Sequence, residues 1–185
     1  MDPVSFDSDL ILKIGRFKDR SAFETLCERY AGKIHGMACR MGLEYRDAEE
    51  ATQDLLIRIW QTADQWAPDK GASAKTWIYK LAKNLIIDHH RKNKKFLHMI
   101  SGNTLSENNL SQDSDSKKMT QQDLIQKALS NLPETQKTAL ILFYYQGLST
   151  REIAHVQNTT EKGVERSLSH ARKKMRASIL DLEEK

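Results

Sequence analysis

The 185-residue sequence contains only two cysteines, three prolines and 7% aromatic residues. Cys27 and Cys39 show no pairing pattern, which fits a reducing cytosol. β-Branched runs are few and no segment alternates with period two, which argues against a sheet. No apolar run approaches a membrane span, and Asp2, Asp7 and Asp9 break the opening residues where a signal peptide would be apolar. We therefore expect a cytoplasmic, all-α protein.

Residues suited to catalysis or metal binding are also sparse. His35 and Cys39 lie four residues apart and could share a metal ion, but no further ligands cluster nearby, so core packing is the better interpretation. Asp47, Glu49 and Glu50 are better explained by the positive end of a helix dipole than by a nuclease site, because no catalytic His or Lys accompanies them. We expect no metal, no cofactor and no catalytic residue.

A basic amphipathic helix is predicted over Lys75–Lys95. Its 3.6-residue period places an apolar stripe on one face, made by Ile78, Leu81, Ala82, Leu85, Ile86 and His89. The other face carries Lys80, Lys83, Asn84, Ile87 and Arg91, with Trp77 at the seam. From Lys80 to Lys95 there are six Lys or Arg against one acid. Such a face suits a phosphate backbone and a stacking base, although a basic surface helix explains the charge alone equally well.

Three further helices are expected before it. Ser8 is the predicted cap of a helix over Asp9–Phe17, and Ser21 with Glu24 forms a predicted capping box for a helix that ends near Gly42. The next helix is expected to begin near Asp47. Its inward stripe leaves a second face of Ile57 and Trp60 beside Glu50, Gln53 and Gln61, which suits a protein partner or packing on a neighbouring helix. The loop Gln65–Ala74 then leads into the basic helix.

The composition changes after the basic helix. Residues 96–118 are polar, rich in Ser and Asn and without periodicity, which predicts a flexible linker between a domain at 1–95 and a domain at 119–185.

The second domain has the spacing of a helix-turn-helix. Thr120 caps one expected helix, Pro133 begins the next and Gly147 ends it. Ser149 and Glu152 form a capping box for a short helix over Thr150–Val156; Asn158 makes the turn, Thr159 or Thr160 caps the last helix, and Ala154 is expected at the helix crossing. The outward face of the last helix carries Lys162, Arg166, Ser169, His170 and Lys173, as a helix in a DNA major groove would. A basic αα-hairpin is the alternative.

The order DAEEATQDLLIRIW, TWIYKLAKNLIIDHHRK, a polar linker, LPETQKTALILFYYQGLSTREIA and GVERSLSHARKKM resembles the bacterial extracytoplasmic-function sigma factors of the sigma-70 family. The resemblance implies a transcription initiation factor that binds core RNA polymerase (β′ and β subunits) and promoter DNA and is usually held by an anti-sigma factor. It implies that Asp47, Glu50, Gln53, Asp54, Ile57 and Trp60 dock on polymerase. The loop with Trp66, Asp69 and Lys70 would capture a flipped −10 base, and Trp77, Lys80, Lys83, Asn84 and Arg91 would line the melted strand. Contacts to the −35 duplex would come from Lys162, Arg166, Ser169, His170, Arg172 and Lys173.

Two departures from the family pattern concern the second domain. Gln157-Asn158 stands where members commonly have Leu-Gly, and Asn tolerates the left-handed conformation that this turn needs. Ser167 and His170 stand where members often carry Arg, which leaves the −35 preference open. The rival interpretation is a stand-alone helix-turn-helix regulator of the LuxR-like kind; no receiver or ligand-binding fold precedes the motif, which argues against it. A nucleic-acid enzyme has no residue constellation to support it.

Overall fold

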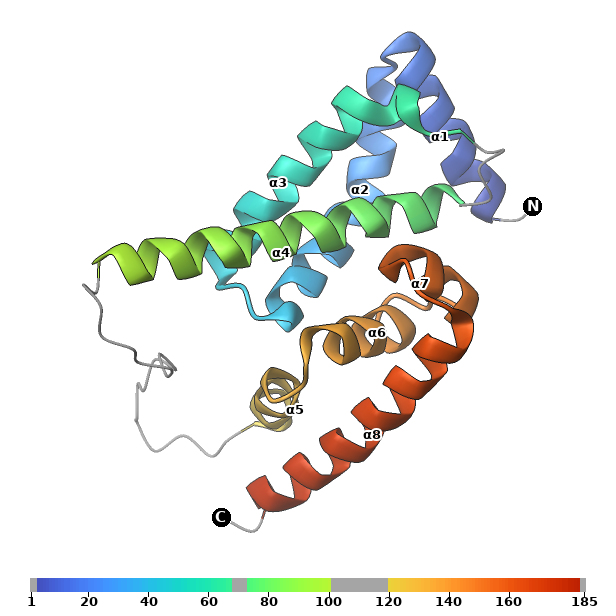
Figure 1. Ribbon diagram of the computed structural model, residues 1–185. Coiled ribbons are helices and arrows are strands. Elements are labelled where there is room, and N and C mark those ends of the chain that lie inside the picture. Colours follow the sequence, from blue (N-terminus) through green and yellow to red (C-terminus); the bar gives the residue numbers. More distant parts are fainter. Residues whose placement is uncertain (1–2, 68–72, 101–119, 184–185) are drawn as a thin grey trace.

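The computed structural model describes residues 3–67, 73–100 and 120–183, which contain helices and no strand. The first half comprises α1 (Pro3–Phe17), α2 (Arg20–Met41), α3 (Tyr45–Thr62), the short 3-10 helix η1 (Ala63–Gln65) and α4 (Ala74–Ile100). The second half comprises α5 (Gln121–Ser130), α6 (Glu134–Tyr144), α7 (Thr150–Gln157) and α8 (Glu161–Glu183). In Figure 1, α1, α2 and α3 meet at the top, α4 crosses below them, and the second half lies beneath α4. The all-α expectation is confirmed.

Two predicted N-caps in the first half are wrong. α1 begins at Pro3, so Ser8 lies inside the helix. α2 is capped by Asp19, whose side chain accepts a hydrogen bond from the Ala22 N–H at 3.1 Å, and Ser21 lies within its first turn. Asp and Ser have nearly equal preferences for the N-cap position. The choice between Asp19 and Ser21 therefore depends on the packing of the helix rather than on the capping residue.

The helix ends of the second half follow the sequence closely. Thr120 and Ser149 each make a complete capping box, and the Gly163 N–H donates to Thr160 Oγ1 at 3.1 Å, which makes Thr160 the cap of α8. Asn158 has φ 52° and ψ 49°, so it adopts the left-handed conformation that the turn requires. The helix-turn-helix spacing read from the sequence is therefore confirmed.

Other boundaries shift by a few residues. α3 begins at Tyr45 rather than near Asp47, and Pro133 is the residue before α6 rather than its first helical residue. α4 continues to Ile100, so the helix extends into the segment predicted as linker. The rest of that segment, from residue 101 to 119, lies outside the described residues.

The buried apolar residues of both halves form one contiguous core. In α4, Ile78, Ala82, Ile86 and His89 are buried, as the predicted stripe requires. Tyr79, which the stripe leaves out, is only 1% exposed because it lies between α2 and the second half of the chain. Among the described residues, no helix combines the length and the hydropathy that a bilayer crossing requires.

Candidate nucleic-acid interface

The charged face of α4 lies along a groove shared with other helices. The groove has a volume of about 400 Å³, and Arg58 of α3, Lys83, Asn84 and Arg91 of α4 and Glu134 of α6 all contribute to its lining. Asn84 and Arg91 are exposed. The carboxylates of Asp88 and Glu134 also line this groove, which therefore holds three cations, two anions and the Asn84 carboxamide. The cations and the carboxamide offer donors for phosphate oxygens, and the carboxamide offers a donor–acceptor pair for a base edge.

Lys83 is the member of this face that its surroundings perturb most. Partial burial lowers the pKa of its ammonium group, the neighbouring charge of Lys80 lowers it further, and Glu134 opposes both effects. Trp77 and Lys80 are half-buried like Lys83. The N-terminal part of the proposed strand-binding face is therefore partly covered, whereas its C-terminal part is open.

The loop before α4 is described only at its ends. Trp66 is 5% exposed, so its ring has no free face for stacking in this conformation, and its Nε1–H has no hydrogen-bond partner among the described residues. Asp69 and Lys70 lie outside the described residues.

The residues predicted to dock on polymerase divide into three environments on α3. Glu50, Gln53 and Ile57 are exposed, with Ile57 at 54%. Trp60 instead packs edge-on against Phe23, with ring centroids 5.1 Å apart, and its carbonyl accepts a hydrogen bond from Lys18 Nζ at 2.9 Å. In the third environment, the carboxylates of Asp47 and Asp54 both contact side chains of α4.

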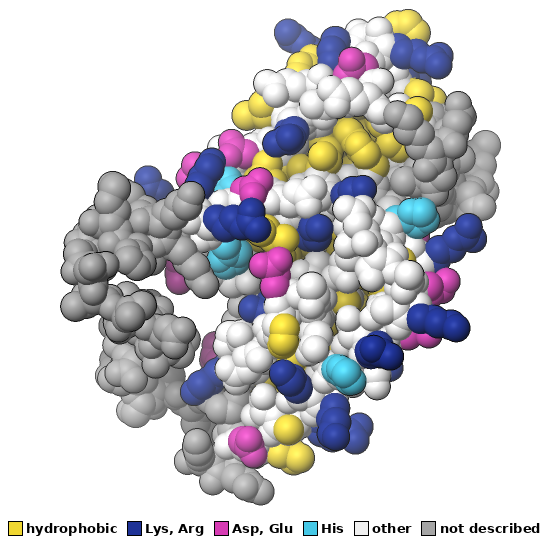
Figure 2. All heavy atoms as spheres, viewed as in Figure 1, with side chains coloured by type: hydrophobic (Ala, Val, Ile, Leu, Met, Phe, Trp, Pro, Cys, Tyr) yellow, Lys and Arg dark blue, Asp and Glu magenta, His cyan; other side chains and the backbone are white. Residues whose placement is uncertain are grey.

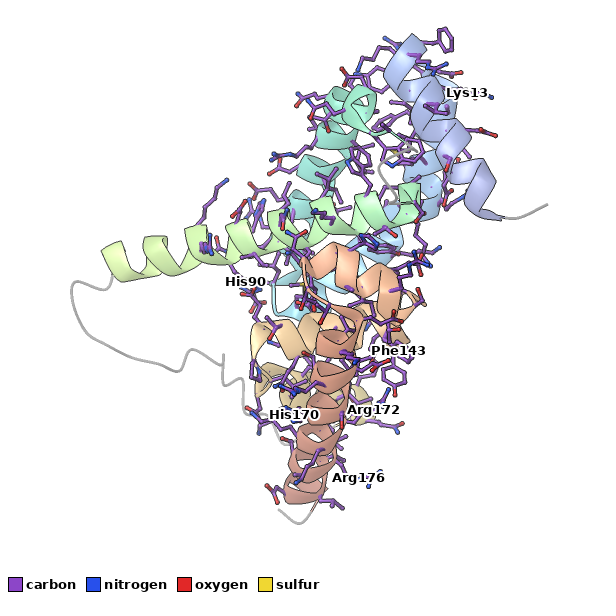
Figure 3. The ribbon with its side chains drawn as sticks, turned by 45° about the vertical axis from the view of Figure 1, so that its right-hand side comes forward. Lys13, His90, Phe143, His170, Arg172 and Arg176 are labelled. Atoms are coloured by element: carbon purple, nitrogen blue, oxygen red, sulfur yellow. The ribbon has the colours of Figure 1, made fainter. Side chains whose placement is uncertain are left out.

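α8 carries a second basic face. Figure 2 shows Lys and Arg side chains in a row over this helix, at the lower right of the view. All six predicted contacts on this helix are exposed, namely Lys162, Arg166, Ser169, His170, Arg172 and Lys173. Figure 3 shows His170 and Arg172 on opposite sides of α8.

Arg172 therefore differs from the other predicted −35 contacts. Its Nε–H donates to the Tyr144 hydroxyl at 3.0 Å, and its guanidinium lies 5.9 Å from the ring centroids of both Phe143 and Tyr144. This side chain faces α6, where it borders a groove of about 430 Å³ with Leu140, Tyr144, Met175, Arg176, Ile179 and Leu180.

The turn between α6 and α7 joins the two halves. Gln146 accepts a hydrogen bond from the Tyr79 hydroxyl at 2.8 Å and donates to the Lys33 carbonyl at 3.3 Å. Lys75 Nζ donates to the Gly147 carbonyl at 3.1 Å, and the Arg40 guanidinium lies 4.1 Å from the centroid of the Tyr145 ring. α7 packs on α4 beside these contacts. Nothing in the sequence pattern pointed to this surface, because its residues have no shared period.

His35 and Cys39, the candidate metal pair, have no further metal ligands beside them in the described part of the chain. Cys39 Sγ lies 3.9 and 4.0 Å from the two ring nitrogens of His35, and the His35 ring stacks edge-on against Tyr45. Among the described residues, no group of three or more His, Cys, Asp or Glu side chains has the arrangement of a metal site.

Comparison with known protein families accounts for both halves. Residues 26–96 match the model described as Sigma-70 region 2, and residues 122–175 match the model described as Sigma-70, region 4. The chain belongs to the sigma-70 family.

Curated relatives place this sigma factor in the extracytoplasmic-function group. It is 29% identical to the ECF RNA polymerase sigma factor RpoE of Cereibacter sphaeroides over 78% of this chain and 79% of that relative. It is 26% identical to the ECF RNA polymerase sigma factor SigW of Bacillus subtilis over 89% of this chain and 92% of that relative. The region 2 match also disfavours the stand-alone LuxR-like regulator, which accounts for the last helices only.

Two solved structures share the fold. CnrH, in complex with the cytosolic domain of CnrY, aligns with a TM-score of 0.71 at 20% identity, covering 96% of this chain and 98% of that one. The sigma factor RpoE of Bartonella quintana, in complex with the anti-sigma factor NepR, aligns with a TM-score of 0.68 at 21% identity, covering 85% and 96%.

Proposed function

We propose that this sigma factor divides promoter recognition between its halves. Residues 1–95 bind core RNA polymerase and the −10 element, residues 119–185 bind the −35 element, and residues 96–118 connect them. The observation that carries this proposal is the presence of two basic helix faces, on α4 and on α8, each at the end of its own half. Two separated cationic faces suit two contacts with one long polyanion.

α4 is assigned to the melted strand. Asn84 and Arg91 are exposed and Trp77 stands at the edge of the same face, which supports contacts to phosphates and unstacked bases. The loop residues Asp69 and Lys70 are assigned to base capture by family resemblance alone. α8 is assigned to the −35 duplex through Lys162, Arg166, Ser169, His170 and Lys173, with Arg172 turned towards α6.

Polymerase docking is assigned to the exposed face of α3. Ile57 provides an apolar contact and Glu50 and Gln53 provide polar ones, an arrangement that suits an interface core with a polar rim. In this scheme the protein itself is not an enzyme, because the polymerase is the catalyst. The protein binds polymerase in the cytoplasm. An anti-sigma partner is included because RpoE of Bartonella quintana was solved with one.

The test is retention on purified core polymerase followed by transcription from a promoter. Retention together with promoter-dependent initiation is expected. A LuxR-like regulator would bind duplex DNA without core polymerase, so failure of the purified protein to associate with core polymerase would overturn the proposal.

A further inference from the structure

Beyond Ile86, three polar contacts join α4 to α2 and α3. His89 Nε2 lies 3.1 Å from Asp54 Oδ2 of α3, and the Asn93 amide donates to Asp47 Oδ2 of α3 at 2.5 Å. Between them, His90 Nε2 lies 3.2 Å from the Met41 carbonyl at the end of α2. We call His89, Asn93, Asp47 and Asp54 the polar seam.

The seam is partly buried, which makes its pairing important. His89 is 6% exposed, whereas the Asp54 side chain is 46% exposed. A polar ring buried to that extent needs a partner, since removing the partner leaves a desolvated group unsatisfied. Asp47 and Asp54 are seven residues apart and so lie on one line of α3, and both contact α4. Asp54 also lines a groove together with Ile57.

The seam also lies beside two cations. Arg58 of α3 and Arg91 of α4 line the same two grooves, with volumes of about 680 and 400 Å³. Arg91 lies between His89 and Asn93, so its turn of helix is anchored on both sides. Any shift of α4 against α3 changes the distance between these guanidinium groups and their fit to successive phosphates.

We propose that Asp47 and Asp54 are positioning residues for the strand-binding helix. Through Asn93 and His89 they fix the C-terminal part of α4, and with it Arg91, against Arg58 of α3. The inference rests on the proposed function of α4, and it gives a positioning role to two of the carboxylates that family resemblance places at the polymerase interface.

The experiment uses holoenzyme reconstituted with Asp54→Ala, with His89→Leu and with both changes. Core polymerase affinity, closed-duplex binding and opening are measured separately, and opening is repeated on a pre-melted template. Each single variant is expected to open the duplex about tenfold less well, with polymerase affinity within about twofold of the parent. The double variant is expected to match the singles because both remove one interaction, and pre-melting is expected to restore part of the loss.

Two matched changes separate positioning from loss of fold. His89→Gln keeps a polar nitrogen near the Nε2 position and is expected to restore most of the opening lost in His89→Leu. Glu49→Ala removes an exposed carboxylate from the same helix outside the seam and is expected to behave like the parent. Thermal unfolding of all variants is recorded, and if Asp54→Ala does not fold, the His89→Leu and His89→Gln pair carries the test.

Three results would overturn the proposal. One is a severalfold loss of polymerase affinity in Asp54→Ala without such a loss in His89→Leu, which would return Asp54 to the interface. The second is multiplicative loss of opening in the double variant, and the third is failure of His89→Gln to restore opening. If the parent protein neither binds polymerase nor opens the promoter, the proposed function fails instead, and that outcome is seen before any variant is compared.

Discussion

The two basic helices present their charged faces to very different surroundings. On α8, Arg166, His170 and Lys173 are exposed to solvent. On α4, Lys80 and Lys83 are half-buried because α7 packs against this helix and Glu134 of α6 borders its groove. A duplex can therefore reach α8 in the arrangement described here, whereas a strand lying along the whole of α4 requires the second half to move away.

This difference has a simple physical origin. α8 buries one narrow apolar stripe within its own half, so its remaining surface meets water. α4 packs against both halves: Ile78 and Ile86 belong to the core, and Tyr79 is buried with its hydroxyl on Gln146. A helix shared in this way loses accessible surface on two sides, and only movement of one half restores it.

The largest effect, on affinity for core polymerase, is expected from Ile57→Glu. This variant tests whether polymerase docks on α3, at a surface separate from the covered face of α4. A charge placed at the centre of an apolar contact should weaken core polymerase binding about 30-fold or more. Direct binding to core polymerase measures it. Phe17→Glu, an equally drastic change at a residue 76% exposed on α1, is the control and should leave the affinity unaltered. Equal affinity of both variants would move the interface off this face.

The sequence predicted single helices better than their shared surfaces. The apolar stripe on α4 follows from local periodicity, and the turn at Asn158 follows from the backbone preference of asparagine. Both are determined by residues that are neighbours in the sequence. For Ile57 and Trp60 the pattern left a protein partner and packing on a neighbouring helix both open, because periodicity gives the face of a helix without saying which neighbour covers it. In the structure Trp60 packs on Phe23. The Gln146 and Asn93 contacts join residues far apart in the chain, which no local pattern encodes.

The next effect compares α4 with α8 directly through Asn84→Ala and Arg166→Ala. Loss of a contact to an unstacked base should reduce opening about tenfold while closed-duplex binding stays near normal. Loss of a duplex contact should instead lower closed-duplex affinity and reduce the salt slope by about one unit. Promoter opening and duplex binding are measured side by side with holoenzyme of each variant.

A pre-melted template distinguishes the two helices further. It should partly rescue Asn84→Ala and give no benefit to Arg166→Ala. If both variants lose closed-duplex binding equally and neither responds to pre-melting, the division of labour between α4 and α8 is wrong.

A smaller effect is expected where the halves meet. Gln146→Ala removes hydrogen bonds to Tyr79 and Lys33, and a net hydrogen bond contributes about 1 kcal/mol, so the contact between the halves should weaken about fivefold or more. Small-angle scattering should report a larger radius of gyration for the variant. Gln121→Ala, an exposed glutamine at the start of α5, is the control. An unchanged radius would show that other contacts hold the halves together.

The smallest effect concerns Lys83, whose pKa is lowered by burial and by Lys80. Taking the burial of Lys83 to come from the packing of the two halves, we expect this lysine to bind its proton more weakly when the halves are packed together than when they separate. At a pH below the lowered pKa the ammonium is charged in both arrangements and its burial opposes closure. As the pH rises from the lowered pKa towards the ordinary value of 10.5, Lys83 loses its proton more readily in the packed arrangement. The cost of burying its charge then disappears, so the packing of the two halves against each other should strengthen with rising pH.

Lys83→Met should therefore favour the packed arrangement at neutral pH and remove this pH dependence, while also weakening strand binding through loss of a cation. Small-angle scattering from neutral to alkaline pH measures both the preference for the packed arrangement and its pH dependence. Lys92→Met, which changes an exposed lysine on the same helix, is the control. The Lys83 variant is expected to combine a smaller radius of gyration with poorer promoter opening, a combination that neither a folding defect nor simple loss of a DNA contact would produce. A radius that grows in Lys83→Met would mean that the charge of Lys83, through Glu134 of α6, holds the halves together rather than apart.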